Sequence, residues 1–228
     1  MIAAWGFKVG IKAVIFDLDG TLIKSKIPFR KMKTRIIKYL REAGVTPSVI
    51  SENMMNFEIM RRAVEDLKSK DFPEEYIREV IDEVTRLMNE VELESADDAE
   101  LIPSVPETVK ALKSNGLRIG LMTRSCRKYV EKILKKFGLL KYFDAILARD
   151  DVVYPKPDPS HAIELLKILN ASVKEAIFVG DHWSDAECAR RAGLRFVWFR
   201  HGENWGTEDS GILKVSSIKE ILEVIQMY

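Results

Sequence analysis

The stretch Ala13-Val14-Ile15-Phe16-Asp17-Leu18-Asp19-Gly20-Thr21 decides the fold of this 228-residue chain. Its apolar beginning predicts a buried strand, and the glycine predicts a turn where that strand ends. Residues two apart in an extended chain point to the same side, so Asp17 and Asp19 can address one small volume. An isolated pair of this kind is more often part of a solvated turn. The rest of the sequence favours a functional site.

The composition of the chain limits its partners and surroundings. There are 36 lysines and arginines against 35 aspartates and glutamates, which gives a net charge of +1. This balance supports neither a nucleic acid nor a membrane as a partner. The apolar beginning of the chain is interrupted by Lys8 and Lys12, so we expect no signal peptide, and no run is long enough to cross a bilayer. Cys126 and Cys188 lack metal-ligand spacing and favour the cytoplasm.

Three segments with helical spacing of apolar residues follow the first strand. They span residues 28–43, residues 47–70, and a stretch that starts at residue 73 and carries its last apolar position at Val91. No strand pattern interrupts them. Their apolar faces therefore predict a small helical bundle, inserted between about residues 24 and 99. The acidic stretch Glu92–Glu100 is expected to be the linker that returns from this bundle.

Helices and short strands alternate regularly from Leu101 onward. The predicted strands span residues 118–122, 145–148, 176–179 and 196–199, and the predicted helices span 106–114, 128–137, 159–169 and 184–192, with a final helix that opens with the capping box Ser217–Glu220. Right-handed crossovers would make this an α/β fold with a doubly wound parallel sheet. We therefore expect a core domain of residues 1–23 and 100–228 and a helical domain of residues 24–99.

Polar residues follow three of these later strands. Thr123-Arg124-Ser125 comes directly after one strand and opens a helix, whose free N–H groups favour an anion. Lys156 lies in a loop that three prolines stiffen. Gly180-Asp181 ends another strand, and Asp185 follows four residues after Asp181. Each has a plainer interpretation, as a helix N-cap or a solvated loop residue. Open α/β sheets, however, keep their ligands at the carboxyl ends of strands.

Together, Asp17-Leu18-Asp19-Gly20-Thr21, Thr123, Lys156-Pro157 and Gly180-Asp181 with Asp185 resemble, in order and strand context, the four motifs of the haloacid dehalogenase superfamily of hydrolases. The resemblance covers essentially the whole chain. It implies a Rossmann-like core, and the helical insertion resembles the superfamily's type-one cap, as in phosphoglycolate phosphatases and β-phosphoglucomutases. Dehalogenation is disfavoured, because the dehalogenases proper lack a residue equivalent to Asp19.

The residue types also suit phosphoryl transfer, which needs a nucleophile, a proton donor and positive charge. Asp17 would attack phosphorus and form an aspartyl-phosphate. Asp19 would protonate the leaving oxygen and then deprotonate the attacking water. Thr123 and Lys156 would hold the phosphate oxygens that are not transferred, with the backbone N–H of Arg124 nearby. The side chain of Arg124 could also bind a second anionic group of the substrate, although a surface salt bridge is an equal alternative.

A hard divalent cation suits an acidic cluster that holds phosphate, and Mg²⁺ is the expected ion. The resemblance implies that Asp17 and Asp181 are side-chain ligands and that Asp19 supplies its backbone carbonyl. Asp185 would support the site through water or through Lys156. His182 is left out of this set, because Mg²⁺ prefers oxygen ligands.

The predicted function is a Mg²⁺-dependent phosphatase that acts on a small phosphorylated metabolite, such as a phosphoglycolate-like or sugar phosphate. Two alternatives remain open. A phosphomutase would pass the phosphoryl group to a second substrate hydroxyl, so its product would be an isomer. A noncatalytic binding protein of the same fold would have lost site residues, whereas Asp17, Asp19, Thr123, Lys156 and Asp181 are all present.

Overall fold

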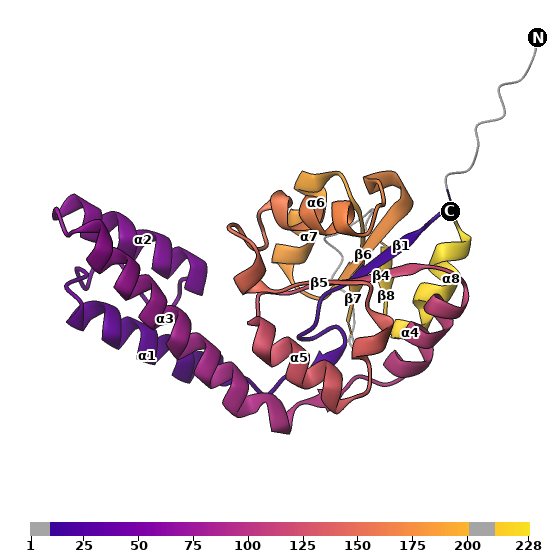
Figure 1. Cartoon of the computed structure of the whole chain (residues 1–228), viewed down its shortest axis with the longest axis horizontal. Coiled ribbons are helices and arrows are strands. Elements are labelled where there is room, and N and C mark those ends of the chain that lie inside the picture. Colours follow the sequence, from indigo (N-terminus) through magenta and orange to yellow (C-terminus); the bar gives the residue numbers. More distant parts are fainter. Residues whose placement is uncertain (1–9, 201–212) are drawn as a thin grey trace, which may run out of the picture. The chain divides into compact units, whose positions relative to one another are not determined.

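A computed structural model describes residues 10–200 and 213–228 of the chain. It divides into two compact units (Figure 1). One unit comprises Lys26–Asp97, and the other comprises the described residues of Met1–Ser25 and Asp98–Tyr228. The prediction about a signal peptide concerns residues 1–9, which lie outside the described residues. Within the described ranges, none of the helices is long and apolar enough to span a membrane.

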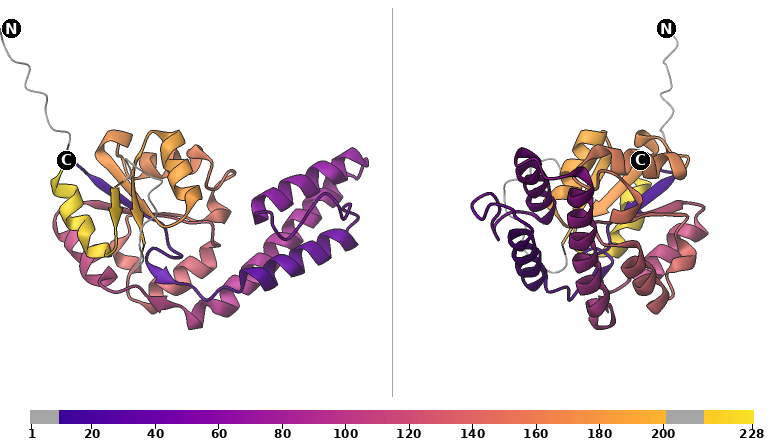
Figure 2. Two further views of the ribbon diagram at one scale, coloured as in Figure 1. Left: turned by 180° about the vertical axis from the view of Figure 1, so that it is seen from behind. Right: turned by 60° about the vertical axis from the view of Figure 1, so that its left-hand side comes forward.

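The smaller unit consists of helices α1 (Phe29–Glu42), α2 (Asn56–Ser69) and α3 (Glu74–Ser95). They lie side by side in the views of Figure 2, and both α1 and α2 pack against α3. Each helix buries one apolar stripe, as its spacing of apolar residues predicts. The three helices therefore bury their apolar stripes against one another.

Two predicted boundaries in this unit are wrong. Helix α2 begins at Asn56 and not near residue 47. The Asp66 carboxylate accepts hydrogen bonds from the N–H and Oγ1 of Thr46, at 2.8 and 3.0 Å, and so fixes the preceding chain as a turn. The acidic stretch from Glu92 is not all linker, because α3 continues to Ser95 before a single 3₁₀ turn at 96–98. Glu92 and Ser95 are both buried, so packing and the helix propensity of glutamate extend the helix.

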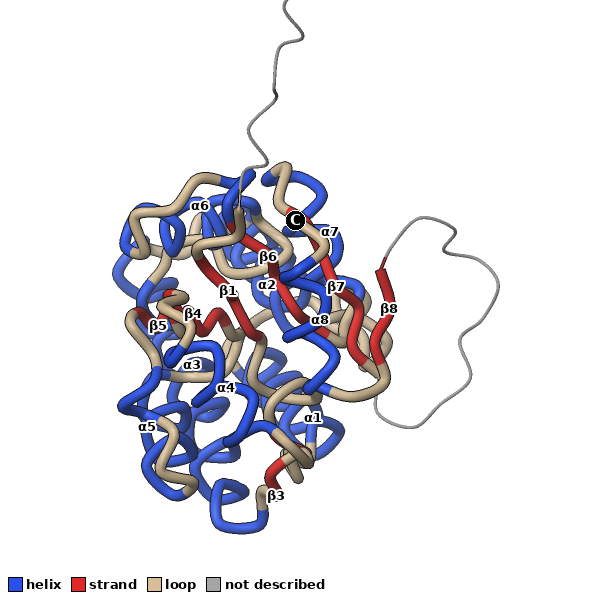
Figure 3. Tube along the Cα trace, turned by 90° about the vertical axis from the view of Figure 1, so that its right-hand side faces the viewer, coloured by secondary structure: helices blue, strands red, loops and turns tan. Residues whose placement is uncertain are grey.

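The larger unit is built on a sheet of six strands: β1 (Ala13–Phe16), β4 (Arg118–Met122), β5 (Ala145–Leu147), β6 (Ala176–Gly180), β7 (Arg195–Phe199) and β8 (Leu213–Val215). Their order is β5-β4-β1-β6-β7-β8, and all neighbours are parallel. Figure 3 shows β1 between β4 and β6, with β8 at the edge. The predicted doubly wound parallel sheet is confirmed, although β8 was not predicted.

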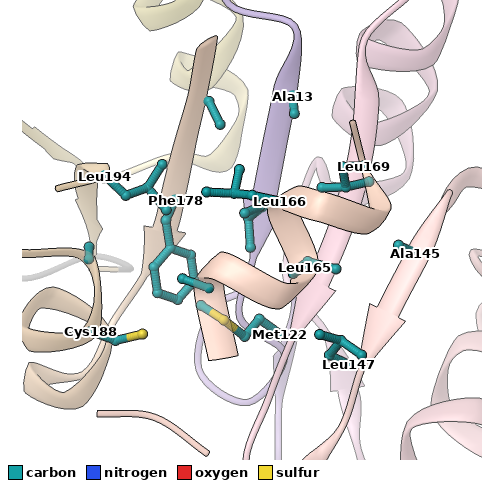
Figure 4. Packing of buried hydrophobic residues seen from close by; sticks show 14 residues of the cluster. Ala13, Met122, Ala145, Leu147, Leu165, Leu166, Leu169, Phe178, Cys188 and Leu194 are labelled. Atoms are coloured by element: carbon teal, nitrogen blue, oxygen red, sulfur yellow. The ribbon is translucent and has the colours of Figure 1, made fainter. Parts of the chain in front are cut away.

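Helices cover both faces of this sheet. Figure 1 shows α6 (Pro159–Ile168) and α7 (Trp183–Ala192) on one face, and α4 (Val105–Ser114), α5 (Arg127–Lys136) and α8 (Ile221–Gln226) on the other. Short 3₁₀ turns span 140–142, 149–151, 173–175 and 218–220. In Figure 4, Leu165 and Leu166 of α6 lie in one buried cluster with Ala13 of β1 and Phe178 of β6. This packing fixes the height of the helix above the central strands.

A second, two-stranded sheet lies where the chain leaves and re-enters the larger unit. Strands β2 (Ile23–Lys24) and β3 (Glu100–Leu101) pair in antiparallel fashion. Sequence patterning does not reveal them, because two residues are too few for a strand period. They pair the chain segments that lie just before and just after the helical insertion.

The strand order places a topological switch point at β1. From β1 the chain passes to β4 and β5 on one side, and from β5 it crosses back to β6 on the other side. The crossover connections therefore diverge at β1, and open α/β sheets bind their ligands at the carboxyl ends of strands at such a point. Asp17 is the first residue after β1, so the pair of aspartates in the first motif lies at this point.

Candidate active site

The loop after β1 carries a buried carboxylate and a glycine that approaches a second one. Asp17 is only 6% exposed, and its N–H donates to the carbonyl of Val179 on β6 at 3.0 Å. Gly20 has a φ of +93°, and a Cβ placed on it would lie 2.0 Å from Oδ2 of Asp181. Only glycine fits both the backbone angle and this close approach.

Three carboxylates meet at the carboxyl ends of β1 and β6. One oxygen each of Asp17, Asp181 and Asp185 lies within 4.8 Å of the other two. Asp181 accepts a hydrogen bond from Oγ1 of Thr21 at 3.3 Å, and Asp185, in the first turn of α7, accepts one from the N–H of His182 at 3.1 Å. Such a cluster of oxygen ligands fits a hard divalent cation.

Lys156 joins two of these carboxylates. Its Nζ lies 2.7 Å from Oδ1 of Asp17 and 2.6 Å from Oδ1 of Asp185, and the residue is 2% exposed. The Nζ also lies 5.3 Å from the centre of the Phe178 ring. A buried ammonium is tolerated only with such charged partners. The lysine therefore belongs to the acidic site and is not a solvated loop residue.

The charges of the cluster are unbalanced without a further cation. Burial raises the pKa of Asp17 well above its usual value; Lys156 opposes this, whereas Asp185 and Asp181 add to it. Burial and then Asp185 raise the pKa of Asp181 to about 6. Burial alone would lower the pKa of Lys156, but Asp17 and Asp185 raise it on balance. One ammonium thus faces three carboxylates, and this surplus of negative charge also fits a divalent cation.

Asp19 turns its carboxylate toward the segment after β4. Its Oδ2 accepts a hydrogen bond from Oγ of Ser125 at 2.6 Å, and its Oδ1 accepts one from Oη of Tyr129 at 3.1 Å. The side chain of Asp19 is therefore not grouped with the three clustered carboxylates. The prediction that Asp19 is a metal ligand concerns its backbone carbonyl and not this carboxylate.

The two predicted phosphate-binding residues after β4 differ in their surroundings. Thr123 is buried, its N–H donates to the carbonyl of Leu147 at 3.1 Å, and its Oγ1 accepts from the N–H of Ser125 at 3.1 Å. The carbonyl of Arg124 accepts from the guanidinium of Arg149 at 2.7 Å. Burial and then the charge of Arg124 lower the pKa of His182, so this guanidinium lies within electrostatic reach of the β6 loop.

Two residues at the site were missed by sequence analysis. Tyr129 belongs to none of the four motifs, although a helix that opens at Ser125 would place it one turn later on the same face. His161 is fully buried: its Nδ1 accepts from the N–H of Lys156 at 3.2 Å, and its Nε2 lies 3.1 Å from the carbonyl of Leu147. This pair of contacts fixes the neutral tautomer with the proton on Nε2. The imidazole thereby ties the lysine loop to the end of β5.

His161 should make the free energy of unfolding fall in mild acid. Burial and the charge of Lys156 lower the pKa of His161 to about 4, from 6.5. Between these two values the unfolded chain binds a proton that the folded chain excludes, so stability rises with pH across this window. Acidification from pH 6.5 to 4 should cost up to about 3 kcal/mol through this residue.

Denaturant unfolding across this range in wild type and in His161→Gln isolates the effect. The amide of the variant can still donate to Leu147 but does not titrate, so the wild type should lose more stability than the variant as the pH falls. If the free energy of unfolding depended on pH in the same way in both proteins, His161 would not be the group responsible.

Comparison with known proteins gives consistent matches over most of the chain. A family model described as haloacid dehalogenase-like hydrolase matches residues 14–199. Phosphoglycolate phosphatase 1 of Pseudomonas aeruginosa is 27% identical over 220 residues, which cover 92% of this chain and 78% of that protein. Phosphoglycolate phosphatase of Aquifex aeolicus is 30% identical over 190 residues, which cover 81% of this chain and 83% of that protein.

A solved structure shares the fold. The crystal structure of β-phosphoglucomutase from Clostridium difficile aligns with a TM-score of 0.66 at 22% identity, and the alignment covers 95% of this chain and 96% of that one. At this identity the likeness concerns the fold alone.

Proposed function

Because this chain belongs to the haloacid dehalogenase-like hydrolase family, we propose that it hydrolyses the phosphate monoester of a small metabolite in a Mg²⁺-dependent reaction. The family and the hydrolase class predicted from the four motifs are confirmed by this match. Relatives that are named phosphoglycolate phosphatases support a phosphoglycolate-like substrate as the first candidate. The observation that carries the proposal is the buried bridge from Lys156 to Asp17 and Asp185 at the switch point of the sheet.

Asp17 acts as the nucleophile in this proposal. One of its carboxylate oxygens attacks phosphorus, so a P–O bond forms to Asp17 while the bond from phosphorus to the leaving oxygen breaks. An aspartyl-phosphate results. The contact from Lys156 favours the ionised carboxylate that this step requires, and the burial of both groups keeps water away from it.

Asp19 moves the protons. It gives its proton to the leaving oxygen in the first step, and the alcohol product departs. In the second step Asp19 takes a proton from water, whose oxygen attacks the phosphorus of the aspartyl-phosphate. Inorganic phosphate leaves and the carboxylate of Asp17 is restored.

Positive charge and hydrogen-bond donors hold the phosphate during both steps. Lys156 and the hydroxyl of Thr123 would contact the oxygens that are not transferred, and the backbone N–H of Arg124 would lie nearby. The Arg124 side chain would then be available for a second anionic group, such as the carboxylate of a phosphoglycolate-like substrate. The charge of Arg124 lowers the pKa of His182, which supports a position of this guanidinium near the loop after β6.

The Mg²⁺ ion would be held by the side chains of Asp17 and Asp181 and by the backbone carbonyl of Asp19. Asp185 would support this set through its contact with Lys156, which lies 2.6 Å away. When bound, Mg²⁺ supplies positive charge that favours the ionised carboxylates and offsets the charge of the phosphate. The clustered carboxylate oxygens support this assignment.

The remaining assignments concern the helical unit and the setting of the protein. We propose that the helices of Lys26–Asp97 form the cap that selects the leaving group, with the core in the residues before and after them. Cys126 and Cys188 are both buried and are not joined in a disulfide, which supports a cytoplasmic setting. The near-neutral charge supports a small molecule, and neither a nucleic acid nor a membrane, as the partner.

Phosphate release from a panel of small phosphate monoesters tests the function. We expect release in the presence of Mg²⁺ and none with EDTA, and 2-phosphoglycolate should be among the better substrates. If a sugar phosphate is converted into its isomer without release of phosphate, the phosphomutase alternative is correct. No turnover of any monoester in the presence of Mg²⁺ would contradict the proposal.

A further inference from the structure

We infer that Ser125 and Tyr129 are positioning residues that hold the Asp19 carboxylate for proton transfer. Ser125 contacts Oδ2 at 2.6 Å, and Tyr129 contacts Oδ1 at 3.1 Å. Each carboxylate oxygen thus has its own donor. Rotation of the carboxylate about its last side-chain bond would break both hydrogen bonds, so the plane of the group is fixed by these hydroxyls.

The two donors are themselves held firmly. Tyr129 is fully buried in α5, and Ser125 is 6% exposed. The position of each hydroxyl is therefore set by core packing. The N–H of Ser125 also donates to Oγ1 of Thr123 at 3.1 Å, which links the donor pair to the residue predicted to hold phosphate. Ser125 therefore connects Asp19 to Thr123 through hydrogen bonds.

The arrangement is compatible with both protonation states of Asp19. Each oxygen of a carboxyl group can accept more than one hydrogen bond. One oxygen can therefore carry or lose the catalytic proton while both hydroxyls continue to donate. The hydroxyls exchange no proton with the substrate, so their contribution acts entirely through the orientation of Asp19.

This inference rests on the proposed function, because it assigns a task to the proton-transfer step. A positioning role predicts that the effect of a substitution depends on the leaving group of the substrate, whereas a purely structural role predicts no such dependence. An alkyl phosphate has a strongly basic leaving oxygen that needs the proton, whereas p-nitrophenyl phosphate has a weakly basic one that needs it far less. Poor positioning of Asp19 should therefore slow the alkyl phosphate selectively.

Tyr129→Phe removes the hydroxyl that donates to Oδ1 of Asp19 and keeps the aromatic ring. We expect kcat/KM to fall about tenfold for the alkyl phosphate and about twofold or less for p-nitrophenyl phosphate. Ser125→Ala should follow the same pattern. In an Asp19→Ala background, the loss of the Tyr129 hydroxyl should have no further effect on the alkyl phosphate, because the two residues then act as one unit.

Matched controls come from hydroxyls elsewhere in the fold. Tyr76 in α3 donates to the carbonyl of Ala43 at 3.1 Å, and Ser114 in α4 donates to the carbonyl of Lys110 at 3.0 Å. Tyr76→Phe and Ser114→Ala remove the same groups away from the site. Both variants should keep the wild-type ratio of the two kcat/KM values.

The possible results distinguish a failure of the positioning role from a failure of the proposed phosphatase function. Equal losses on both substrates, or no loss on either, in an active wild-type background would overturn the inference and leave the phosphatase assignment standing. A wild-type protein that hydrolyses neither substrate with Mg²⁺ would overturn both. A selective loss on the alkyl phosphate that disappears in the Asp19→Ala background would establish the inference.

Discussion

Asp17→Asn should lower kcat for phosphate release by about 10⁴-fold or more, since an amide cannot form the aspartyl-phosphate. The substitution preserves the size of the side chain. Phosphate release should be measured with the best monoester under saturating Mg²⁺, beside Asp71→Asn as a control. Asp71 is exposed in the helical unit and has a positive φ that asparagine tolerates, so this control should keep the wild-type rate.

The same variant should remain folded. Burial and the neighbouring carboxylates raise the pKa of Asp17, which means that the ionised group is poorly accommodated by the apo protein. Lys156 keeps Asp185 as a charged partner at 2.6 Å. The free energy of unfolding without metal should therefore be close to that of the wild type. Wild-type turnover in Asp17→Asn would exclude Asp17 as the nucleophile.

Gly20→Ala should damage the site through a different route. A methyl group there would lie 2.0 Å from Oδ2 of Asp181, so either the loop or this carboxylate must move. A φ of +93° adds backbone strain. We expect a loss of stability of about 1–3 kcal/mol and a weaker apparent affinity for Mg²⁺, with at least about tenfold more metal needed for half-maximal rate.

Gly116→Ala is the matched control for this variant. Gly116 also has a positive φ, of +77°, but a Cβ there would meet nothing within 4 Å. It carries the backbone strain without the clash, so it should lose some stability and keep its Mg²⁺ dependence. Denaturant unfolding and a Mg²⁺ titration of phosphate release compare the two. Identical behaviour would show that the approach of Gly20 to Asp181 is unimportant.

Much of the core could be predicted because its signals are local. The run Ala13–Phe16 is apolar throughout, as a strand buried on both faces must be, and β6 shares this pattern. Parallel strands bring their carboxyl ends to one edge of a sheet, so motifs that follow β1, β4 and β6 meet there. The meeting of Asp17 with Asp181 follows from this rule, whereas Lys156 lies further along the loop after β5 and is brought to the site by tertiary packing.

Other features depend on tertiary contacts that no local pattern records. The contact of Tyr129 with Asp19 joins residues 110 positions apart and depends on the angle at which α5 leaves β4. The imidazole of His161 is placed by the packing of α6 on the sheet. The acidic end of α3 resembles a linker in composition, yet the burial of Glu92 and Ser95 extends the helix. In each case packing outweighs the local signal.

The nucleophilic role of Asp17 is tested by looking for phosphate on this residue during turnover. The enzyme should be mixed with substrate and Mg²⁺, quenched rapidly in acid and digested, and the peptide that contains Asp17 analysed by mass. We predict one added phosphoryl group on that aspartate, absent with EDTA and absent in Asp17→Asn. Rapid turnover with no phosphoryl group on Asp17 at any time, or with the group on another residue, would show that Asp17 is not the nucleophile.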